Sequence, residues 1–131
     1  MIFVDTGAWY ASIVPADVNH AAATSWLQHN SQPLLTTDYV ADETLTLLRM
    51  RGYPSLAIDL GQALFGGELA NVLHVTERDV QEAWRIFRDY RDKDWSFTDC
   101  TCHAVMNRLK IEQAFSFDQH FRQFGSVQIV P

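Results

Sequence analysis

Short apolar runs alternate with longer amphipathic stretches along this chain, and the alternation restricts the fold more strongly than any other feature of the sequence. The apolar runs have the length of buried strands and lie at 2–4, 34–37, 72–75, 114–117 and 127–130. Helical patterns separate them, at 8–14, 19–29, 38–51, 55–64, 76–90 and 98–110. Short apolar strands alternating with helices are typical of βαβ units, in which helices cover both faces of a parallel sheet. The expected fold class is therefore α/β with a central parallel sheet.

The length of the chain, 131 residues, is enough for one domain with a substantial core, so we expect a single domain spanning 1–131. Hydrophobic residues make up 47% of it, which favours a globular fold over disorder. No apolar run approaches the roughly 20 residues of a membrane-spanning helix, and we see no signal peptide. Cys100 and Cys102 are too close in sequence to close a useful disulfide loop. A reduced, cytoplasmic protein is therefore expected.

Acidic residues outnumber basic ones. Ten Lys and Arg residues face sixteen Asp and Glu residues, which gives a formal net charge of −6 at pH 7. Such a charge argues against a broad electropositive surface for nucleic acid. The argument weakens where acidic side chains hold cations, because bound divalent ions would offset part of the negative charge. The charge alone therefore leaves nucleic-acid binding open.

Aspartates follow two of the predicted strands. Asp5 comes directly after the strand at 2–4, and Asp118 directly after the strand at 114–117. Ligands of parallel α/β sheets bind beyond the carboxyl ends of the strands, so both side chains are expected at that edge. Asp99 lies in the first turn of the helix predicted from Thr98, and such helices begin at the same edge. Each aspartate alone is also explained as a turn or N-cap residue, or as a complement to the helix dipole.

Glu43 lies on an apolar stripe of the helix predicted at 38–51. It shares this stripe with Val40, Leu47 and Met50, so its carboxylate is expected to face inward and find a partner. The alternative is an edge position from which the carboxylate reaches solvent. Clustered carboxylates repel one another unless a cation neutralises them, and oxygen ligands suit Mg²⁺ or Mn²⁺. One hypothesis, a divalent metal site, therefore accounts for all four acids together.

Four segments of the chain, in this order, resemble the acidic motifs of PIN domains, and most closely those of the VapC-type toxins of bacterial and archaeal toxin–antitoxin pairs. The segments are IFVDTGAWYA (2–11), DETLTLL (42–48), DWSFTDC (94–100) and FSFDQHF (115–121). A single aspartate after a strand is common, whereas the ordered set with its SFTD context is specific. The resemblance covers essentially the whole chain.

The resemblance implies a three-layer α/β/α sandwich that acts as a divalent-metal-dependent endoribonuclease. Its cofactor would be Mg²⁺ or Mn²⁺, and it would hydrolyse RNA phosphodiesters with metal-activated water. The protein would be the toxin of a toxin–antitoxin pair, with a cognate antitoxin as partner and a homodimer as its expected state. The alternative is a non-catalytic PIN-type module that binds RNA or protein. Such modules typically lack one or more of the four acids, and this chain keeps all of them.

The resemblance also assigns roles to individual residues. The catalytic and metal-binding set is Asp5, Glu43, Asp99 and Asp118. The supporting set is Thr6, Ser96, Asp94 and Thr98. Asp94 matches an acid sometimes found near a second metal, and a solvated loop position is its alternative. Thr98 is expected to cap the helix that carries Asp99, and Trp95 and Phe97 to anchor the preceding loop in the core. No substrate-binding residue is assigned.

Two further features have competing interpretations. His120 could touch the substrate, but a surface histidine is the preferred interpretation. Arg85, Arg88 and Arg91 form a line on one predicted helix, where nearby acids favour a solvated, ion-paired face over contact with RNA phosphates.

Leucines on the two adjacent helices at 38–51 and 55–64 exceed what one small core is expected to bury. They are Leu45, Leu48, Leu56, Leu60 and Leu64. These leucines predict an apolar face that meets a second copy of the chain or an antitoxin helix.

Overall fold

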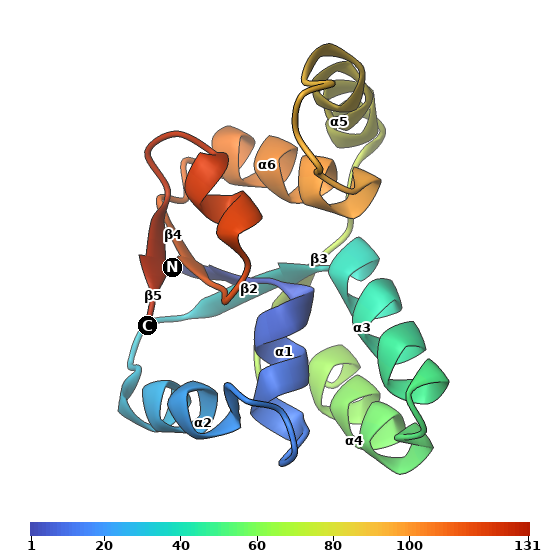
Figure 1. The fold of residues 1–131 in the computed structure, drawn as a ribbon, viewed down its shortest axis with the longest axis vertical. Coiled ribbons are helices and arrows are strands. Elements are labelled where there is room, and N and C mark those ends of the chain that lie inside the picture. The colour runs from blue at the N-terminus through green and yellow to red at the C-terminus, as the bar shows by residue number, and fades with distance from the viewer.

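The centre of the protein is a five-stranded sheet in which every neighbouring pair of strands is parallel (Figure 1). The computed structural model describes residues 1–131. The strands are β1 (Ile2–Val4), β2 (Leu34–Thr37), β3 (Asn71–Leu73), β4 (Gln113–Phe115) and β5 (Gln128–Val130). They are arranged in the order β3-β2-β1-β4-β5, so the first strand of the chain is the central one. The predicted parallel sheet is confirmed.

Helices cover both faces of this sheet. One face carries α1 (Thr6–Ile13), α2 (His20–His29), α3 (Asp38–Met50) and α4 (Pro54–Phe65). The other face carries α6 (Phe97–Leu109) and the 3-10 helix η1 (Gln119–Gln123), with α5 (Glu77–Asp89) packed on the outside of α6 (Figure 1). The architecture is the expected three-layer α/β/α sandwich. None of its helices combines the length and the apolar character needed to cross a membrane.

The core lies on both sides of the central strand. Ile2, Phe3 and Val4 are all buried, as expected for a strand that is covered by helices on both faces. On the α1–α2 side the ring of Trp26 stacks on Phe115 of β4, with 4.3 Å between the ring centroids. On the other side Phe121 of η1 stacks on Phe3. These contacts hold the ends of β1 and β4 side by side.

The start of α6 differs from the prediction, because another residue caps this helix. Ser96, not Thr98, is the N-cap of α6: its hydroxyl accepts a hydrogen bond from the backbone N–H of Asp99. Thr98 lies inside the first turn, so its predicted capping role is wrong. Thr37 caps α3 in the same way, by accepting a hydrogen bond from the backbone N–H of Val40. An N-cap hydroxyl must stand one residue before the helix to reach the free N–H groups of the first turn.

Strand β4 ends at Phe115, two residues earlier than predicted. Ser116 and Phe117 therefore separate the strand from Asp118. The chain first moves outward from β1 to β3 and then crosses to the opposite side of β1, where it forms β4 and β5. The strand order therefore reverses between β1 and β4. Such a switch point at the carboxyl ends of the strands is where α/β sheets bind ligands.

Candidate metal centre

Asp5 follows β1 and is almost completely buried. One of its carboxylate oxygens accepts a hydrogen bond from the backbone N–H of Ala8 at 2.8 Å and thereby caps α1, and the other accepts one from the hydroxyl of Ser116. Burial raises the pKa of this carboxyl from 3.8 to about 7, with the two hydrogen bonds opposing the rise and the charges of Asp118 and Asp99 adding to it. A cation bound beside Asp5 would favour its ionised form.

Asp99 is held by the first turn of α6. Its carboxylate accepts a hydrogen bond from the backbone N–H of Ser96 at 3.1 Å, and its own N–H donates to the Ser96 hydroxyl at 3.0 Å. This capping box fixes the direction of a side chain that is only 14% exposed. Burial raises the pKa of Asp99, and the charge of Asp118 adds to the rise while Ser96 and His120 oppose it.

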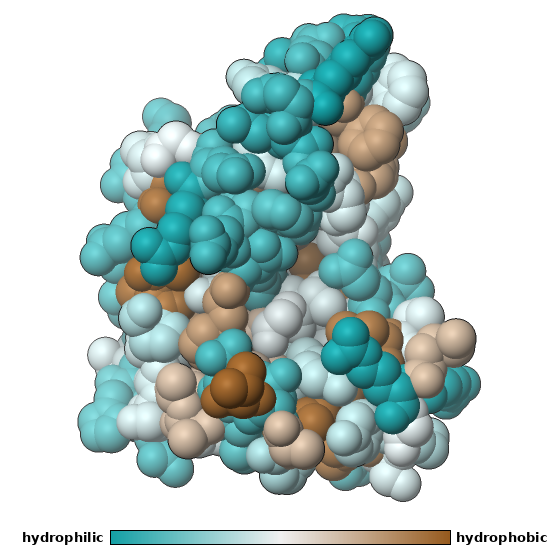
Figure 2. Space-filling model, viewed as in Figure 1, coloured by the Kyte–Doolittle hydropathy of each residue, from teal (hydrophilic) through white to brown (hydrophobic).

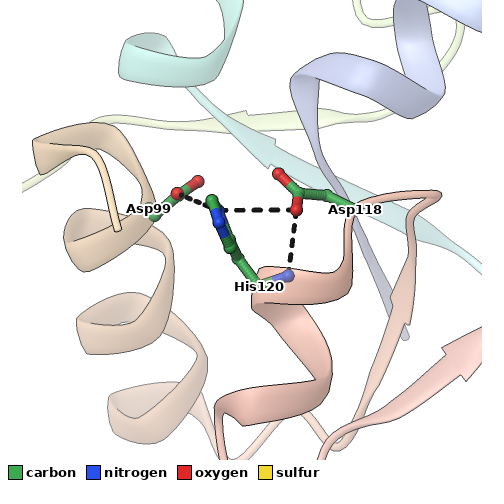
Figure 3. A group of neighbouring side chains, drawn as sticks. All are labelled: Asp99, Asp118 and His120. Carbon is green, nitrogen blue, oxygen red and sulfur yellow. Dashed lines mark hydrogen bonds and ion pairs between the residues drawn. The ribbon is translucent and has the colours of Figure 1, made fainter. Parts of the chain in front are cut away.

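Asp118 and His120 meet Asp99 at the carboxyl end of β4 (Figure 3). The carboxylate of Asp118 accepts a hydrogen bond from the backbone N–H of His120 at 2.9 Å, which makes Asp118 the N-cap of η1. Nδ1 of His120 lies 3.1 Å from Asp99 Oδ2 and 3.4 Å from Asp118 Oδ1. One ligand atom from each of the three side chains lies within 4.8 Å of the others. His120 is thus a partly exposed residue at the edge of the site, where its ring contacts two of the acids.

Ser116 is a residue of the site that the sequence interpretation missed. Its buried hydroxyl donates to the carboxylate of Asp5 and accepts a hydrogen bond from the backbone N–H of Asp118 at 3.0 Å. It therefore links the aspartate of β1 to the aspartate that follows β4. The available signal was a serine inside the FSFD motif, which had been assigned to the strand itself.

Glu43 projects from α3 and is half-buried. Its charge acts on the buried thiol of Cys102 together with those of Asp99 and Asp5: burial first, then these three carboxylates, raise the pKa of that thiol. The charge of Glu43 therefore reaches the same thiol as the charges of Asp99 and Asp5, although Glu43 makes no hydrogen bond with these acids. Its predicted apolar stripe is correct only in part, because Val40 is buried but Met50 is 79% exposed.

The supporting residues divide into two groups. The hydroxyl of Thr6 is buried next to Asp5 and has no hydrogen-bond partner, and Ser96 closes the capping box around Asp99. Asp94 is exposed and forms no hydrogen bond or ion pair. Thr98 makes no side-chain hydrogen bond with the acids; its backbone carbonyl accepts a hydrogen bond from Thr101. Of the four supporting residues, Ser96 alone is hydrogen-bonded to one of the acids.

The residues present fit a divalent cation. Like charges gather at one sheet edge, and the buried acids among them have raised pKa values, which a cation would reverse. The carboxylates of Asp5, Asp99, Asp118 and Glu43 supply the oxygen donors that Mg²⁺ and Mn²⁺ take. The buried hydroxyl of Thr6 has no hydrogen-bond partner in the protein, and a water molecule bound to a nearby ion would supply one.

The structure also bears on the predicted roles of Arg85 and Trp95. Arg85 forms ion pairs with Glu82 and with Asp89, which supports the solvated, ion-paired face over a free basic line. The ring of Trp95 is buried and its N–H donates to the side chain of Gln123 at 2.9 Å, so its predicted anchoring role is confirmed.

The fold and the acidic centre define a class of protein, a parallel α/β domain with a carboxylate site at its switch point. The PIN domain family model matches residues 2–127, so the chain belongs to that family. The chain is 32% identical over 131 residues to the 23S rRNA-specific endonuclease VapC20 of Mycobacterium tuberculosis, covering 100% of this chain and 99% of the relative. It is 26% identical over 123 residues to a VapC ribonuclease of Archaeoglobus fulgidus, covering 90% of this chain and 77% of the relative.

Solved structures agree with this assignment. The crystal structure of Mycobacterium tuberculosis VapC20, described as a sarcin-ricin loop cleaving toxin, matches with a TM-score of 0.93 at 30% identity over 100% of both chains. The structure of FitAcB from Neisseria gonorrhoeae matches with a TM-score of 0.72 at 15% identity, over 100% of this chain and 97% of the other. The second likeness shows the fold alone.

Proposed function

We propose that residues 1–131 act as a single PIN domain, a divalent-metal-dependent endoribonuclease that is the toxin of a toxin–antitoxin pair. The observation that carries the proposal is the convergence of Asp5, Asp99 and Asp118 at the switch point of the sheet, joined by Ser116 and His120. The relatives named as VapC ribonucleases support the reaction class. Both cysteines are free, which is consistent with a cytoplasmic protein.

Each acid of the site has a proposed role. Asp5, Asp99 and Asp118 would hold Mg²⁺ or Mn²⁺, with Glu43 approaching from α3. When bound, such an ion lowers the pKa of water and offsets the charge of a phosphodiester. Without it, the acidic edge would repel an RNA backbone. Ser96 and Ser116 hold Asp99 and Asp5 in fixed directions through their hydroxyl groups, so the donor atoms need no rearrangement.

Ribosomal RNA is the substrate class to test first. One relative is named a 23S rRNA-specific endonuclease, and its crystal structure describes a toxin that cleaves the sarcin-ricin loop. The alternative function, a non-catalytic module that binds RNA or protein, does not require the acids to be placed together. The links among Asp5, Asp99 and Asp118 through Ser116 and His120 support the nuclease, so we favour it.

The proposed antitoxin site is a groove between α3 and α4. Apolar surface gathers in the part of the molecule formed by α1 to α4, whereas the part around α5 and α6 is mostly hydrophilic (Figure 2). The exposed apolar side chains of the two helices are Met50, Ile58 and Phe65. Of the leucines expected there, Leu48, Leu60 and Leu64 are buried, and Leu45 and Leu56 are half-buried. That part of the prediction was wrong, because α3 and α4 pack these side chains against each other and the core.

The test is a cleavage assay on total cellular RNA and on intact ribosomes, with Mg²⁺, Mn²⁺ or EDTA. Asp99→Asn should abolish metal-dependent cutting. Asp92→Asn is the matched control, because that carboxylate lies in the loop before α6 and is 75% exposed. Absence of cutting by the unaltered protein in every condition, with metal binding intact by calorimetry, would favour the binding module.

A further inference from the structure

The ring of His120 lies between two of the proposed metal-binding carboxylates. It points from η1 toward Asp99 of α6 and toward Asp118, with Nδ1 facing both (Figure 3). If carboxylate oxygens alone bound the metal, this nitrogen would have no role in the site. Since the nitrogen lies close to both acids, the ring could either bind an ion that they hold or support Asp99 through a hydrogen bond.

The spacing of the three donor atoms matches that of neighbouring ligands around one ion. In a near-octahedral site with bonds of about 2.1 Å, adjacent ligand atoms are about 3 Å apart. The distance from Nδ1 of His120 is 3.1 Å to Asp99 Oδ2 and 3.4 Å to Asp118 Oδ1. Small adjustments of these side chains would therefore complete a shared site.

The backbone around His120 is held firmly. Its N–H donates to the Asp118 carboxylate, which ties the ring and that acid to the same turn. The next residue, Phe121, is 1% exposed and packs against both Phe3 and Phe124. The His120 side chain itself is 31% exposed, so an ion from solvent can reach it. A rigid backbone with an accessible ring is what a metal ligand requires.

We propose that Nδ1 of His120 is a nitrogen ligand of the divalent ion held by Asp99 and Asp118, and that it shifts the metal preference of the site from Mg²⁺ toward Mn²⁺. The inference rests on the proposed function, because it needs a metal centre at these acids. Imidazole nitrogen binds transition-metal ions well, whereas Mg²⁺ favours carboxylate and water oxygens. His120 therefore contributes more to the binding of Mn²⁺ than to that of Mg²⁺.

A purely supporting role makes different predictions. If His120 only donated a hydrogen bond to Asp99, its loss would weaken the binding of both ions alike, and no nitrogen would bind the ion directly. The two roles are therefore separated by the kind of ion that is affected and by direct detection of a metal–nitrogen bond.

The experiment is pulsed electron paramagnetic resonance on the full-length protein loaded with Mn²⁺, together with calorimetric titration of Mn²⁺ and Mg²⁺. His120→Gln is the test variant, because it keeps a polar side chain of similar length. His74→Gln is the matched control. His74 pairs with one aspartate, Asp38, but its side chain is 86% exposed and lies outside the centre. Thermal unfolding checks that both variants are folded.

We expect nitrogen hyperfine coupling from one imidazole in the unaltered protein and in His74→Gln, and its loss in His120→Gln. The Mn²⁺ affinity of His120→Gln should fall at least about tenfold, the lower limit for loss of even an outer-shell partner, with a smaller fall for Mg²⁺. Mn²⁺ binding without this coupling, or equal losses for both ions, would overturn the role of His120 and leave the proposed function standing. If the folded, unaltered protein binds no Mn²⁺ at all, the metal centre and this inference both fail.

Discussion

The surroundings of the Asp5 side chain oppose the ionisation of its carboxyl group. Its carboxyl group is 5% exposed and lies near Asp99 and Asp118, yet it must be ionised to bind a cation. In the folded protein its pKa is about 7 rather than 3.8, so the unfolded chain releases this proton at lower pH than the folded one. The unfolding free energy of the metal-free protein therefore loses a contribution as the pH rises from about 4 to 7.

Asp5→Asn should remove this pH-dependent destabilisation. The asparagine keeps an oxygen to accept the hydrogen bond from Ala8, and its amide can donate to the Ser116 hydroxyl. Relative to the unaltered protein without metal, the variant should gain stability progressively between pH 4 and 7, by on the order of 1–4 kcal/mol. Urea unfolding in EDTA at several pH values measures the difference, and a difference that does not change with pH would contradict the raised pKa.

The same variant should also lose function. Cleavage should fall at least about 100-fold, a typical loss when one group that stabilises the charge of the transition state is removed. Added Mn²⁺ should raise the melting temperature of the unaltered protein, because a ligand that binds only the folded state stabilises it. Asp5→Asn should show a much smaller rise. Near-normal cleavage with unchanged metal dependence would disprove the assignment of Asp5.

At the level of helices and strands, local patterns predicted most elements and missed contacts between distant segments. Thr76 caps α5 through a capping box with Asp79. Ser96 and Asp99 have the same spacing as Thr76 and Asp79. The same local pattern therefore indicates Ser96 as the cap of α6, in place of the predicted Thr98. The bond between Ser116 and Asp5 spans 111 residues, and no periodicity of the chain encodes it. The strand-edge rule predicted the neighbouring acids, but side-chain partners such as Ser116 depend on the finished packing.

One ion pair joins α5 to α6 through a buried carboxylate. Both oxygens of the buried carboxylate of Asp79 accept hydrogen bonds from Arg108, at 2.7 and 2.8 Å. This guanidinium holds the pKa of Asp79 below its usual value, so the pair stabilises the fold above pH 4 and is lost as the pH falls through the lowered pKa. Arg108→Gln should cost about 1.5–3 kcal/mol at pH 7, toward the lower end because the arginine side chain is 40% exposed.

Denaturant unfolding at pH 7 and pH 3 measures this cost. Arg88→Gln is the control, since its partner Asp89 is exposed and the change should stay within about 0.5 kcal/mol. Arg108 lies in the last turn of α6, far along the helix from Asp99, so cleavage by folded protein should be retained. Equal effects of the two substitutions would show that burial of Asp79 does not matter.

Trp95 joins the two segments that carry the centre. Its indole N–H donates to the side chain of Gln123 in η1, and its ring packs on Phe124. Trp95→Phe keeps an aromatic ring but removes this bond between the loop before α6 and η1. We expect the metal affinity to fall by no more than about tenfold, the lower limit for a partner bonded directly to a ligand, and Gln123→Ala to behave similarly in calorimetry. Trp84→Phe, at a ring that is 54% exposed, should leave the affinity unchanged; a similar loss there would point to a general effect of tryptophan removal.

At the scale of the whole molecule, α3 connects the metal centre to the apolar groove. Glu43 belongs to this helix, and so do Leu45 and Met50, which line the groove with Ile58 and Phe65 of α4. A partner seated between α3 and α4 would therefore contact the helix that carries one of the four acids.

The groove should bind the antitoxin by burying these apolar side chains, which calls for an amphipathic helix. Ile58→Asp places a charge at its centre, and it should fold normally because Ile58 is 52% exposed. We expect RNA cleavage by the variant to be unchanged but no longer inhibited by the co-expressed cognate antitoxin. Val18→Asp is the control, because Val18 is 93% exposed and does not line the groove. Sedimentation velocity without the antitoxin completes the test: if Ile58→Asp converts a dimer to a monomer and inhibition persists, the groove is occupied by a second copy of the chain.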